Sequence, residues 1–332
     1  MKVGIVGCGA IAARAHIPSF ARASVQVVAV ADTDISRANS FARKFGIPHV
    51  YSDFRQLLEE DLDLVSICTP PKTHGLIAIE AAHKGKHVLL EKPMTTTLTE
   101  AEELVSACTA NKTKLCVVHQ YRFIPCVQEA KKRIAEGRLG KIISIHLTAH
   151  PQFPMRWADS GWLYDKWSLL DDIGVHLLDI LTFLSDANAI RVSLGAHDST
   201  GKMGFFDSIQ ATIELEDSQA VYLDLSWIIG SYELTANVFG TAGKLTLDIR
   251  NNFLSEIHGY VTPFDEMSQT LRKSTGTFAS ALTRKYFRGT LIYHDILIRS
   301  FIDSISKGDP SPVGPLEGMR IVRFLEKIKL AN

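Results

Sequence analysis

The chain has 332 residues, which is too long for one ordinary core and predicts two domains. Hydrophobic residues make up 46% of it and the mean hydropathy is near zero, as in a soluble globular protein. Lysine plus arginine and aspartate plus glutamate balance at 36 each, so no net field favours nucleic acid or an anionic membrane. No apolar run approaches the roughly 20 residues of a membrane span. The first expected strand begins at Lys2, which leaves no room for a signal peptide.

The cysteines show no CxxC pairing, and their number is odd. Most lie in apolar strand or helix contexts, which favours small buried hydrophobic residues in a reducing compartment. We therefore expect a cytoplasmic protein without structural disulfides. The five residues are Cys8, Cys68, Cys108, Cys116 and Cys126.

The first 120 residues alternate between strand and helix patterns. Continuous apolar strands alternating with helices are typical of a parallel sheet covered on both faces. Asp53 is placed as a helix N-cap, and Gly46 and Gly85 close two helices. The expected strands are 2–9, 25–32, 49–52, 62–71, 87–93 and 114–122, and the expected helices are 11–23, 35–46, 53–61, 73–85 and 97–112.

The alternation of strand and helix patterns ends near Tyr121. Several later segments alternate apolar with polar residues, as half-buried antiparallel strands do. Two domains, 1–120 and 121–332, are therefore predicted: a doubly wound α/β domain and an α+β domain. The second has expected strands at 141–150, 190–199, 207–217, 219–229, 232–240 and 243–249, and expected helices at 123–140 and 169–186.

A dinucleotide fingerprint stands between the first strand and helix. Gly7, Gly9 and Ala12 form a G-x-G-x-x-A pattern, and Asp32 follows Ala12 by 20 residues at the end of the second strand. The first glycine allows the tight turn, and the second lets the backbone approach a pyrophosphate. Ala10 and Ile11 open the helix whose N-terminus would carry the phosphates. The alternative is a structural turn with Asp32 as an N-cap.

Asp32 also indicates which cofactor would bind. A carboxylate there accepts hydrogen bonds from the ribose hydroxyls of NAD and repels the 2′-phosphate of NADP. Arg37 could accommodate that phosphate, or it could lie on a solvated helix face. NAD is the predicted cofactor, with NADP as the alternative.

Polar side chains follow the fourth and fifth strands at the same edge of the sheet. Thr69, Pro70 and His74 belong either to a rigid loop or to a nicotinamide contact. The fifth strand ends on Glu91 and Lys92, also assigned to the cofactor site. A flexible ammonium beside a cofactor suits proton transfer or the holding of a hydroxyl.

The expected helix 169–186 has two faces. Its core stripe is Ile173, Leu177, Ile180 and Leu184, and its polar stripe is Asp172, His176 and Asp179. Asp172 could be an N-cap, and His176 a hydrogen-bonded interfacial histidine. Chelation of a metal is a weak alternative because no further ligand cluster follows, so we predict no metal. A carboxylate near an imidazole can instead serve general acid–base chemistry.

Taken in order, these motifs resemble a known family. "GCGAIA", Asp32, "CTPPKTH", "EKP", "YRF" and the "DxGxHxxD" pattern beginning at Asp172 are followed by "VFGTAGKLTLD" and "GDPSPVGPLEGMRIVRFLEKI". The chain resembles the glucose-fructose oxidoreductase, inositol dehydrogenase and rhizopine-catabolism family, called Gfo/Idh/MocA. The likeness covers essentially the whole chain.

The resemblance implies an N-terminal Rossmann domain and a C-terminal domain with an open, mostly antiparallel sheet, through which members form homodimers or homotetramers. It implies an enzyme that passes hydride between nicotinamide and a secondary hydroxyl of a sugar, cyclitol or sugar nucleotide. The family's catalytic lysine falls on Lys92 and its acid–base histidine on His176, with Asp172 beside them. The assigned substrate residues are Gln120, Arg122, Trp162, Asp172 and His176.

One segment departs from the family pattern. Lys166, Trp167 and Ser168 occupy positions that are glycine-rich in many members, so we expect a narrowed or redirected substrate pocket. Two alternative functions stay open: a sensor that binds NAD without turnover, and a glycoside hydrolase that uses bound NAD. Between residues 267 and 290, basic residues without acidic ones indicate a solvated helix face or an oligomer contact, or else a contact with a phosphorylated substrate.

Overall fold

We describe a computed structural model of the chain, covering residues 1–155, 161–201, 204–259 and 289–332. Within these ranges, no helix combines the length and the apolar character that a membrane crossing requires. The five cysteines are buried, as predicted.

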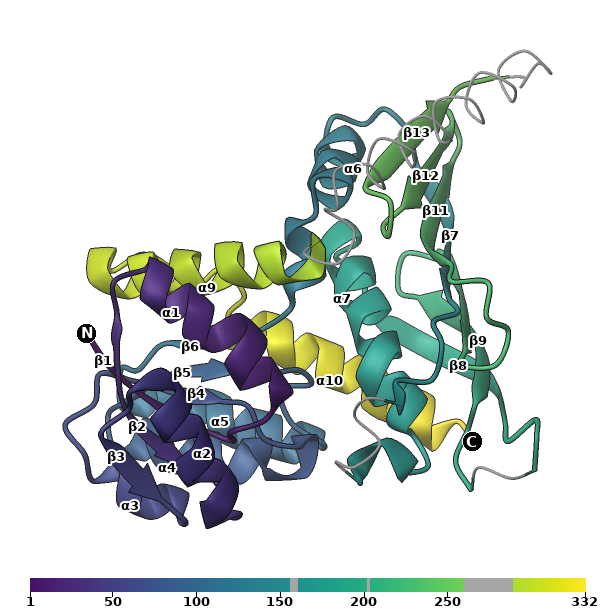
Figure 1. Cartoon of the computed structure of the whole chain (residues 1–332). Helices are drawn as coiled ribbons and strands as arrows, with labels where there is room; N and C mark the ends of the chain where they lie inside the picture. Colours follow the sequence, from purple (N-terminus) through teal and green to yellow (C-terminus); the bar gives the residue numbers. More distant parts are fainter. Residues whose placement is uncertain (156–160, 202–203, 260–288) are drawn as a thin grey trace. The chain divides into compact units, whose positions relative to one another are not determined.

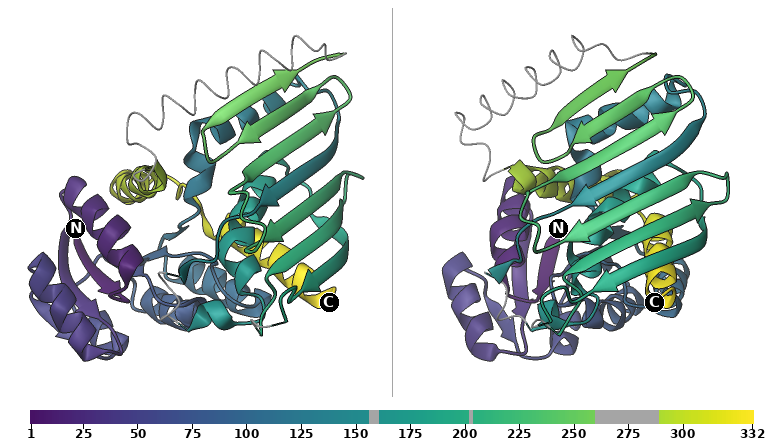
Figure 2. Two further views of the ribbon diagram at one scale, coloured as in Figure 1. Left: turned by 45° about the vertical axis from the view of Figure 1, so that its right-hand side comes forward. Right: turned by 90° about the vertical axis from the view of Figure 1, so that its right-hand side faces the viewer.

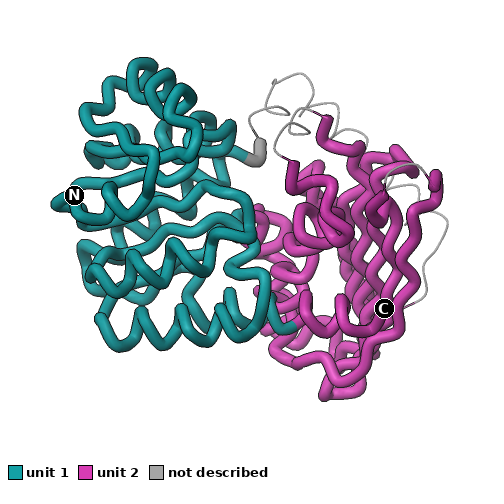
Figure 3. The backbone as a smooth tube through the Cα atoms, turned by 90° about the horizontal axis from the view of Figure 1, so that it is seen from below, with its two compact units in different colours: residues 1–120, 290–323 teal, residues 121–289, 324–332 magenta. Residues whose placement is uncertain are grey.

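The chain forms two compact units (Figure 3). Met1–Gln120 and Thr290–Arg323 make up the first, and Tyr121–Gly289 and Phe324–Asn332 the second. The division into domains 1–120 and 121–332 stays a prediction. The two units differ from the predicted domains because residues 290–323, late in the chain, pack with the first unit. No local sequence pattern could indicate this contact.

The first unit contains a six-stranded parallel sheet in the order β3-β2-β1-β4-β5-β6, which confirms the predicted doubly wound fold (Figure 1). The strand order reverses direction at β1, and ligands of such sheets bind at the carboxyl ends of the strands beside this reversal. The strands are β1 (Lys2–Val6), β2 (Gln26–Ala31), β3 (His49–Tyr51), β4 (Leu64–Ile67), β5 (His87–Leu90) and β6 (Leu115–Val117).

Each of the strands β1 to β5 is followed by a helix, and capping residues mark where two of these helices begin or end. Asp53 caps its helix by accepting from the Arg55 N–H, and Gly46 closes another in the left-handed region. A late helix, α9, lies beside α1, and Arg22 Nε donates to Asp295 Oδ1 at 2.8 Å. The described helices of this unit are α1 (Ile17–Arg22), α2 (Ile35–Phe45), α3 (Phe54–Leu58), α4 (His74–His83), α5 (Leu98–Ala110), α9 (Gly289–Lys307) and the start of α10 (Pro315–Leu330).

The second unit contains a seven-stranded sheet in the order β13-β12-β11-β7-β10-β9-β8. Only the central β7–β10 pair is parallel, so the predicted mostly antiparallel sheet is confirmed. The sequence analysis missed β13, a short edge strand with weak alternation. The strands are β7 (Ile142–Ala149), β8 (Ala189–His197), β9 (Ser208–Leu215), β10 (Ala220–Ser226), β11 (Leu234–Gly240), β12 (Lys244–Asp248) and β13 (Phe253–Ile257).

One face of this sheet is apolar and covered by helices (Figure 2). Ile145, Leu147 and Ala149 of β7 alternate onto it and are buried. The covering helices are α6 (Pro125–Ala135) and α7 (Val175–Leu184), and no described helix packs on the other face. The predicted helix 169–186 begins as a π-helical turn, η6 (Leu170–Gly174), and α7 is buried along most of its length. His176 and Asp179 of the predicted polar stripe are buried as well, so this stripe is covered by other parts of the protein.

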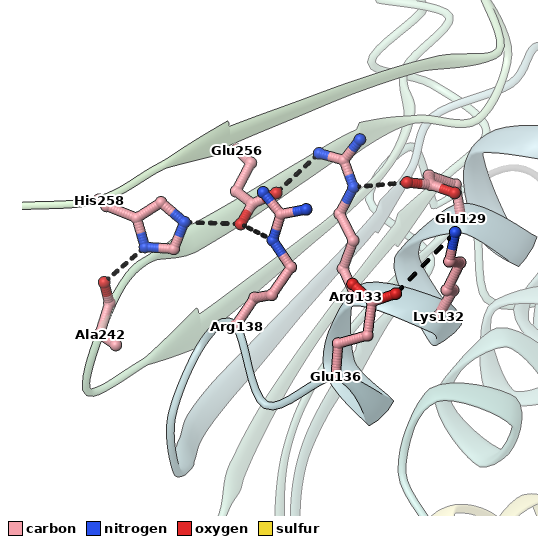
Figure 4. A network of polar contacts seen from close by, with 8 residues as sticks. All are labelled: Glu129, Lys132, Arg133, Glu136, Arg138, Ala242, Glu256 and His258. Atoms are coloured by element: carbon pink, nitrogen blue, oxygen red, sulfur yellow. Dashed lines mark hydrogen bonds and ion pairs between the residues drawn. The ribbon is translucent and has the colours of Figure 1, made fainter.

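An ionic network ties the edge strand β13 to α6 (Figure 4). The Glu256 carboxylate accepts from Arg133 at 2.7 Å, from Arg138 at 2.8 Å and from His258 at 2.6 Å. Burial alone would raise the pKa of Glu256, but the hydrogen bonds from His258 and Arg133 hold it below its usual value. These ion pairs attach β13, the edge strand of the sheet, to α6 and to the segment after it. An unattached edge strand can pair with a strand of another molecule.

A buried ion pair links the start of the second unit to α7. Arg122 Nε donates to Asp179 Oδ1 at 3.0 Å and to Oδ2 at 3.3 Å, and the two side chains are 7% and 0% exposed. Breaking such a pair leaves an uncompensated buried charge, which is costly.

Replacing Asp179 by alanine should therefore lower the free energy of unfolding of the second unit by about 3–5 kcal/mol. All four tryptophans of the sequence fall between residues 121 and 289, so tryptophan fluorescence during urea unfolding monitors this unit. The control is Glu214→Ala, which removes the exposed Arg191–Glu214 pair at 3.8 Å and should cost at most about 1 kcal/mol. Equal losses in the two variants would contradict the prediction.

Candidate active site

The turn after β1 approaches the backbone of the neighbouring strand end too closely for a side chain. Gly7 has a φ of +95°, and a Cβ there would lie 2.7 Å from the carbonyl carbon and oxygen of Cys68. Its N–H donates to Ala31 O at 2.8 Å at the end of β2. Glycine is therefore required at this position by conformation and by space.

The second glycine leaves open space instead. A Cβ at Gly9 would meet nothing within 4 Å. Ala10 and Ile11 lead into the π-helical turn η1 (Ala12–His16), whose first N–H groups lack intrahelical acceptors. Ala12 is fully buried, as close packing of helix against strand requires. This cradle at a helix N-terminus fits the pyrophosphate of a dinucleotide.

Asp32 lies directly after β2 and is 9% exposed. Its Oδ2 accepts from the Cys8 N–H at 2.9 Å and its Oδ1 from the Asp34 N–H at 2.9 Å. Arg37 Nη1 lies 3.4 Å from Asp32 Oδ1, and the Arg37 side chain is 56% exposed. The carboxylate thus braces the glycine turn and retains lone pairs for ribose hydroxyls, with an arginine beside it.

His74 follows the loop after β4. The imidazole is fully buried, with Nδ1 2.7 Å from Pro93 O and Nε2 2.8 Å from Thr69 O. His74 therefore joins the loops after β4 and β5, and its assignment as a cofactor contact stays a prediction. Thr69 is half-buried and Pro70 is exposed, so both stay predicted cofactor contacts.

The strand β5 ends at a buried carboxylate and a half-buried amine, those of Glu91 and Lys92. Glu91 Oε1 lies 2.9 Å from Nε2 of His16, a residue that the sequence analysis did not assign. The Lys92 N–H donates to Glu91 Oε2 at 3.3 Å, and the Lys92–Pro93 peptide bond is cis. Lys92 therefore follows β5 at the edge of the sheet, and its backbone is bonded to a buried neighbour, Glu91.

In the second unit, His176 is 5% exposed and stacks on a tyrosine. The ring centroids of Tyr121 and His176 are 4.2 Å apart with an interplanar angle of 17°. Asp172 lies one turn earlier, half-buried within η6. Burial raises the pKa of Tyr121 to about 12, and the Asp172 carboxylate adds to the rise. Tyr121 thus stays neutral beside the candidate acid–base residue.

The assigned substrate residues Arg122, Gln120 and Trp162 differ in their surroundings. Arg122 is paired with Asp179 inside the unit, and its assignment as a substrate contact stays a prediction. Gln120 is 5% exposed, and its Oε1 has no hydrogen-bond partner among the described residues. That orphaned acceptor is compatible with a ligand contact. Trp162 is half-buried at the start of the short turn η5 (Trp162–Tyr164).

The bulky segment that departs from the family pattern packs on its neighbour. The Trp167 and Phe206 rings meet edge to face with centroids 4.9 Å apart, and Lys166 Nζ lies 5.0 Å from the Phe206 centroid. Ser168 is buried.

Within the described ranges, no three His, Cys, Asp or Glu side chains are grouped to hold a metal. The basic segment, apart from its last two residues, lies outside the described residues.

Sequence reasoning missed His16 and Tyr121. His16 lies four residues after Ala12 of the fingerprint, in a helix whose other buried residues are apolar. A histidine on the buried side of a helix, so close to a cofactor motif, was the sequence signal for a functional contact. Tyr121 belongs to the quoted "YRF" motif, but its stacking on His176 depends on tertiary contact.

Comparison with known proteins agrees with this geometry. Residues 1–119 match the family model described as the oxidoreductase family with an NAD-binding Rossmann fold, and residues 127–246 match the Gfo/Idh/MocA C-terminal domain. Levoglucosan dehydrogenase of Pseudarthrobacter phenanthrenivorans is 28% identical over 291 residues, which is 78% of this chain and 71% of that protein. Glucose-6-phosphate 3-dehydrogenase of Bacillus subtilis is 29% identical over 79% of this chain and 73% of its own length.

A solved structure shares the fold across the whole chain. The WlbA dehydrogenase from Bordetella pertussis, in complex with NADH and UDP-GlcNAcA, aligns with a TM-score of 0.84 at 20% identity. The alignment covers 100% of this chain and 95% of that one. With both family models matched in order and the fingerprint residues in place, the chain belongs to the Gfo/Idh/MocA family of NAD-binding oxidoreductases.

Proposed function

We propose that this protein is an NAD-preferring dehydrogenase or reductase acting on a secondary hydroxyl of a sugar, cyclitol or sugar nucleotide. The observation that carries the proposal is the meeting of the open Gly9 cradle, Asp32 and Lys92 at one edge of the first sheet. Relatives named for levoglucosan and glucose 6-phosphate support a carbohydrate-like substrate.

The bound nicotinamide accepts or donates hydride at C4. When the alcohol is oxidised, its carbon loses hydride and its hydroxyl loses a proton, so a base must lie within hydrogen-bond reach. His176 takes that proton, and Lys92 orients and polarises the hydroxyl. The two roles can be exchanged. Asp172, one turn before His176, positions the imidazole.

The two alternative functions receive less support. A sensor that binds NAD without turnover has no need of Lys92 and His176, and both residues are present. For a hydrolase that uses bound NAD, no residue of the chain gives direct support. The five buried cysteines support a cytoplasmic location.

The same proposal includes assembly into a homodimer or homotetramer through the uncovered face of the second sheet. His146 of β7 lies on that face between Tyr222 of β10 and Phe239 of β11, with both centroid distances 4.7 Å. Tyr222 is 45% exposed. Aromatic side chains on an uncovered face are typical of protein interfaces.

A first test concerns the cofactor. Asp32→Ala should narrow the preference for NADH over NADPH, because the repulsion of the 2′-phosphate is lost and Arg37 remains. Dissociation constants for both cofactors, measured by fluorescence, provide the comparison. Asp32→Asn is the matched variant, because its amide oxygen can still brace the Cys8 N–H. Equal affinity of the unmutated protein for the two cofactors would contradict the assignment of Asp32 as the residue that selects NAD.

A second test concerns the chemistry. A thermal-shift screen with NAD and levoglucosan, glucose 6-phosphate, inositol and UDP-sugars should identify a ligand, whose oxidation is then followed as NADH. General acid–base catalysis contributes about 10²–10⁴-fold, so Lys92→Ala and His176→Ala should each lower kcat by roughly that factor. NADH affinity should stay nearly unchanged in His176→Ala.

The control for this test is Lys86→Ala, at the other end of β5, where the amine donates to Glu60 O. That variant should keep its kcat. Full turnover by Lys92→Ala or by His176→Ala would remove that residue from the mechanism.

A third test concerns assembly. Tyr222→Glu places a charge on the uncovered face and should convert the oligomer to a smaller species in light scattering. Leu330→Glu, at a residue 77% exposed near the C-terminus, should leave the mass unchanged. A monomeric unmutated protein would rule out this part of the proposal.

A further inference from the structure

A chain of buried polar contacts runs from the cofactor turn to the residue before Lys92. His16 is the last residue of η1 and is fully buried. Its Nδ1 lies 2.8 Å from Ser66 Oγ on β4, and its Nε2 lies 2.9 Å from Glu91 Oε1. The helix that starts at the pyrophosphate cradle is thus bonded to the end of β5.

The carboxylate in this chain is ionised. Burial alone would lower the pKa of His16, but Cys68 and the Glu91 carboxylate outweigh it and raise the pKa to about 10. Burial alone would raise the pKa of Glu91, but the hydrogen bond from His16 lowers it to about 2. His294 of α9 also faces this carboxylate, with Nε2 3.9 Å from Oε1. The same carboxylate accepts the Lys92 N–H through Oε2.

A second buried histidine holds the other side of Lys92. His74 reaches Pro93 O with Nδ1 and Thr69 O with Nε2, and so spans the loops after β5 and β4. Lys92 therefore stands between two neighbours, Glu91 and Pro93, each bonded to an imidazole from elsewhere in the unit. The Lys92 amine itself is only half-buried.

We propose that His16 and His74 are positioning residues for Lys92. They hold the backbone on both sides of it, through Glu91 and through Pro93. His16 additionally sets this backbone relative to the cofactor cradle, because its own helix begins there. The inference rests on the proposed function, in which Lys92 orients the reacting hydroxyl.

A double-mutant cycle separates positioning from simple core packing. His16→Gln replaces a cationic imidazole by a neutral amide beside Glu91 and removes the Nδ1 contact with Ser66 Oγ. His74→Gln keeps a donor near the position of Nε2 but removes the Nδ1 contact with Pro93 O. Small displacements of a catalytic group cost up to about 10²-fold, so each variant should lower kcat by roughly 10–100-fold, with KM little changed. In a Lys92→Ala background the same substitutions should lower kcat no further. An equal fall in both backgrounds would overturn the proposal.

The control is His87→Gln, at the opposite end of β5, where half-buried His87 Nδ1 accepts from the Lys114 N–H at 3.0 Å. This substitution should lower thermal stability without lowering kcat. If His16→Gln does not fold, Glu91→Gln breaks the same contact with an isosteric side chain and should give the same non-additive loss.

A readout without substrate keeps this inference distinct from the proposed function. Reductive methylation with ¹³C-formaldehyde labels lysine amines, and the Lys92 resonance is assigned by its absence in Lys92→Ala. That resonance should move in His16→Gln and in His74→Gln, but not in His87→Gln. A folded His16→Gln protein with an unmoved resonance overturns the inference. Full turnover by Lys92→Ala overturns the catalytic role of Lys92 while a moved resonance still supports the histidine contacts.

Discussion

All six strands of the first sheet run in one direction, and this constraint brings the chemistry of the first unit together. Parallel strands end at the same edge, so the turns after β1, β2, β4 and β5 meet although they are far apart in sequence. The fit there is tight enough that Gly7 tolerates no Cβ against Cys68. At Gly9, in contrast, a Cβ would meet nothing within 4 Å, so the backbone there leaves room for a pyrophosphate to approach.

Each unit buries an ion pair next to a candidate catalytic residue. Glu91, paired with His16, directly precedes Lys92, while Asp179, paired with Arg122, follows His176 by one turn. Buried pairs are often no more stabilising than apolar residues of similar volume, so stability alone is a weak reason for them. Both pairs join separate segments instead: the first connects η1 with the end of β5, and the second connects the start of the second unit with α7.

The segment before η6 packs on a neighbouring segment of the second unit. Trp167 and Lys166 pack on Phe206, and the Phe206 N–H donates to Lys166 O at 3.1 Å. These bulky residues are held by their neighbour and lead into the π-helical turn that contains Asp172. That this segment narrows or redirects a substrate pocket stays a prediction.

Local sequence patterns were enough to predict the Rossmann strands, their helix caps at Asp53 and Gly46, the cofactor fingerprint and the antiparallel character of the second sheet. These features depend on local periodicity and backbone conformation, which neighbouring residues encode. Other features depend on long-range contacts: His74 faces two carbonyls, Arg122 is paired internally, His16 binds Glu91 and β13 completes the sheet. A polar residue in a motif looks the same whether it faces a ligand or the core. The difference lies in the partners that folding brings within hydrogen-bond distance, and those partners come from distant parts of the chain.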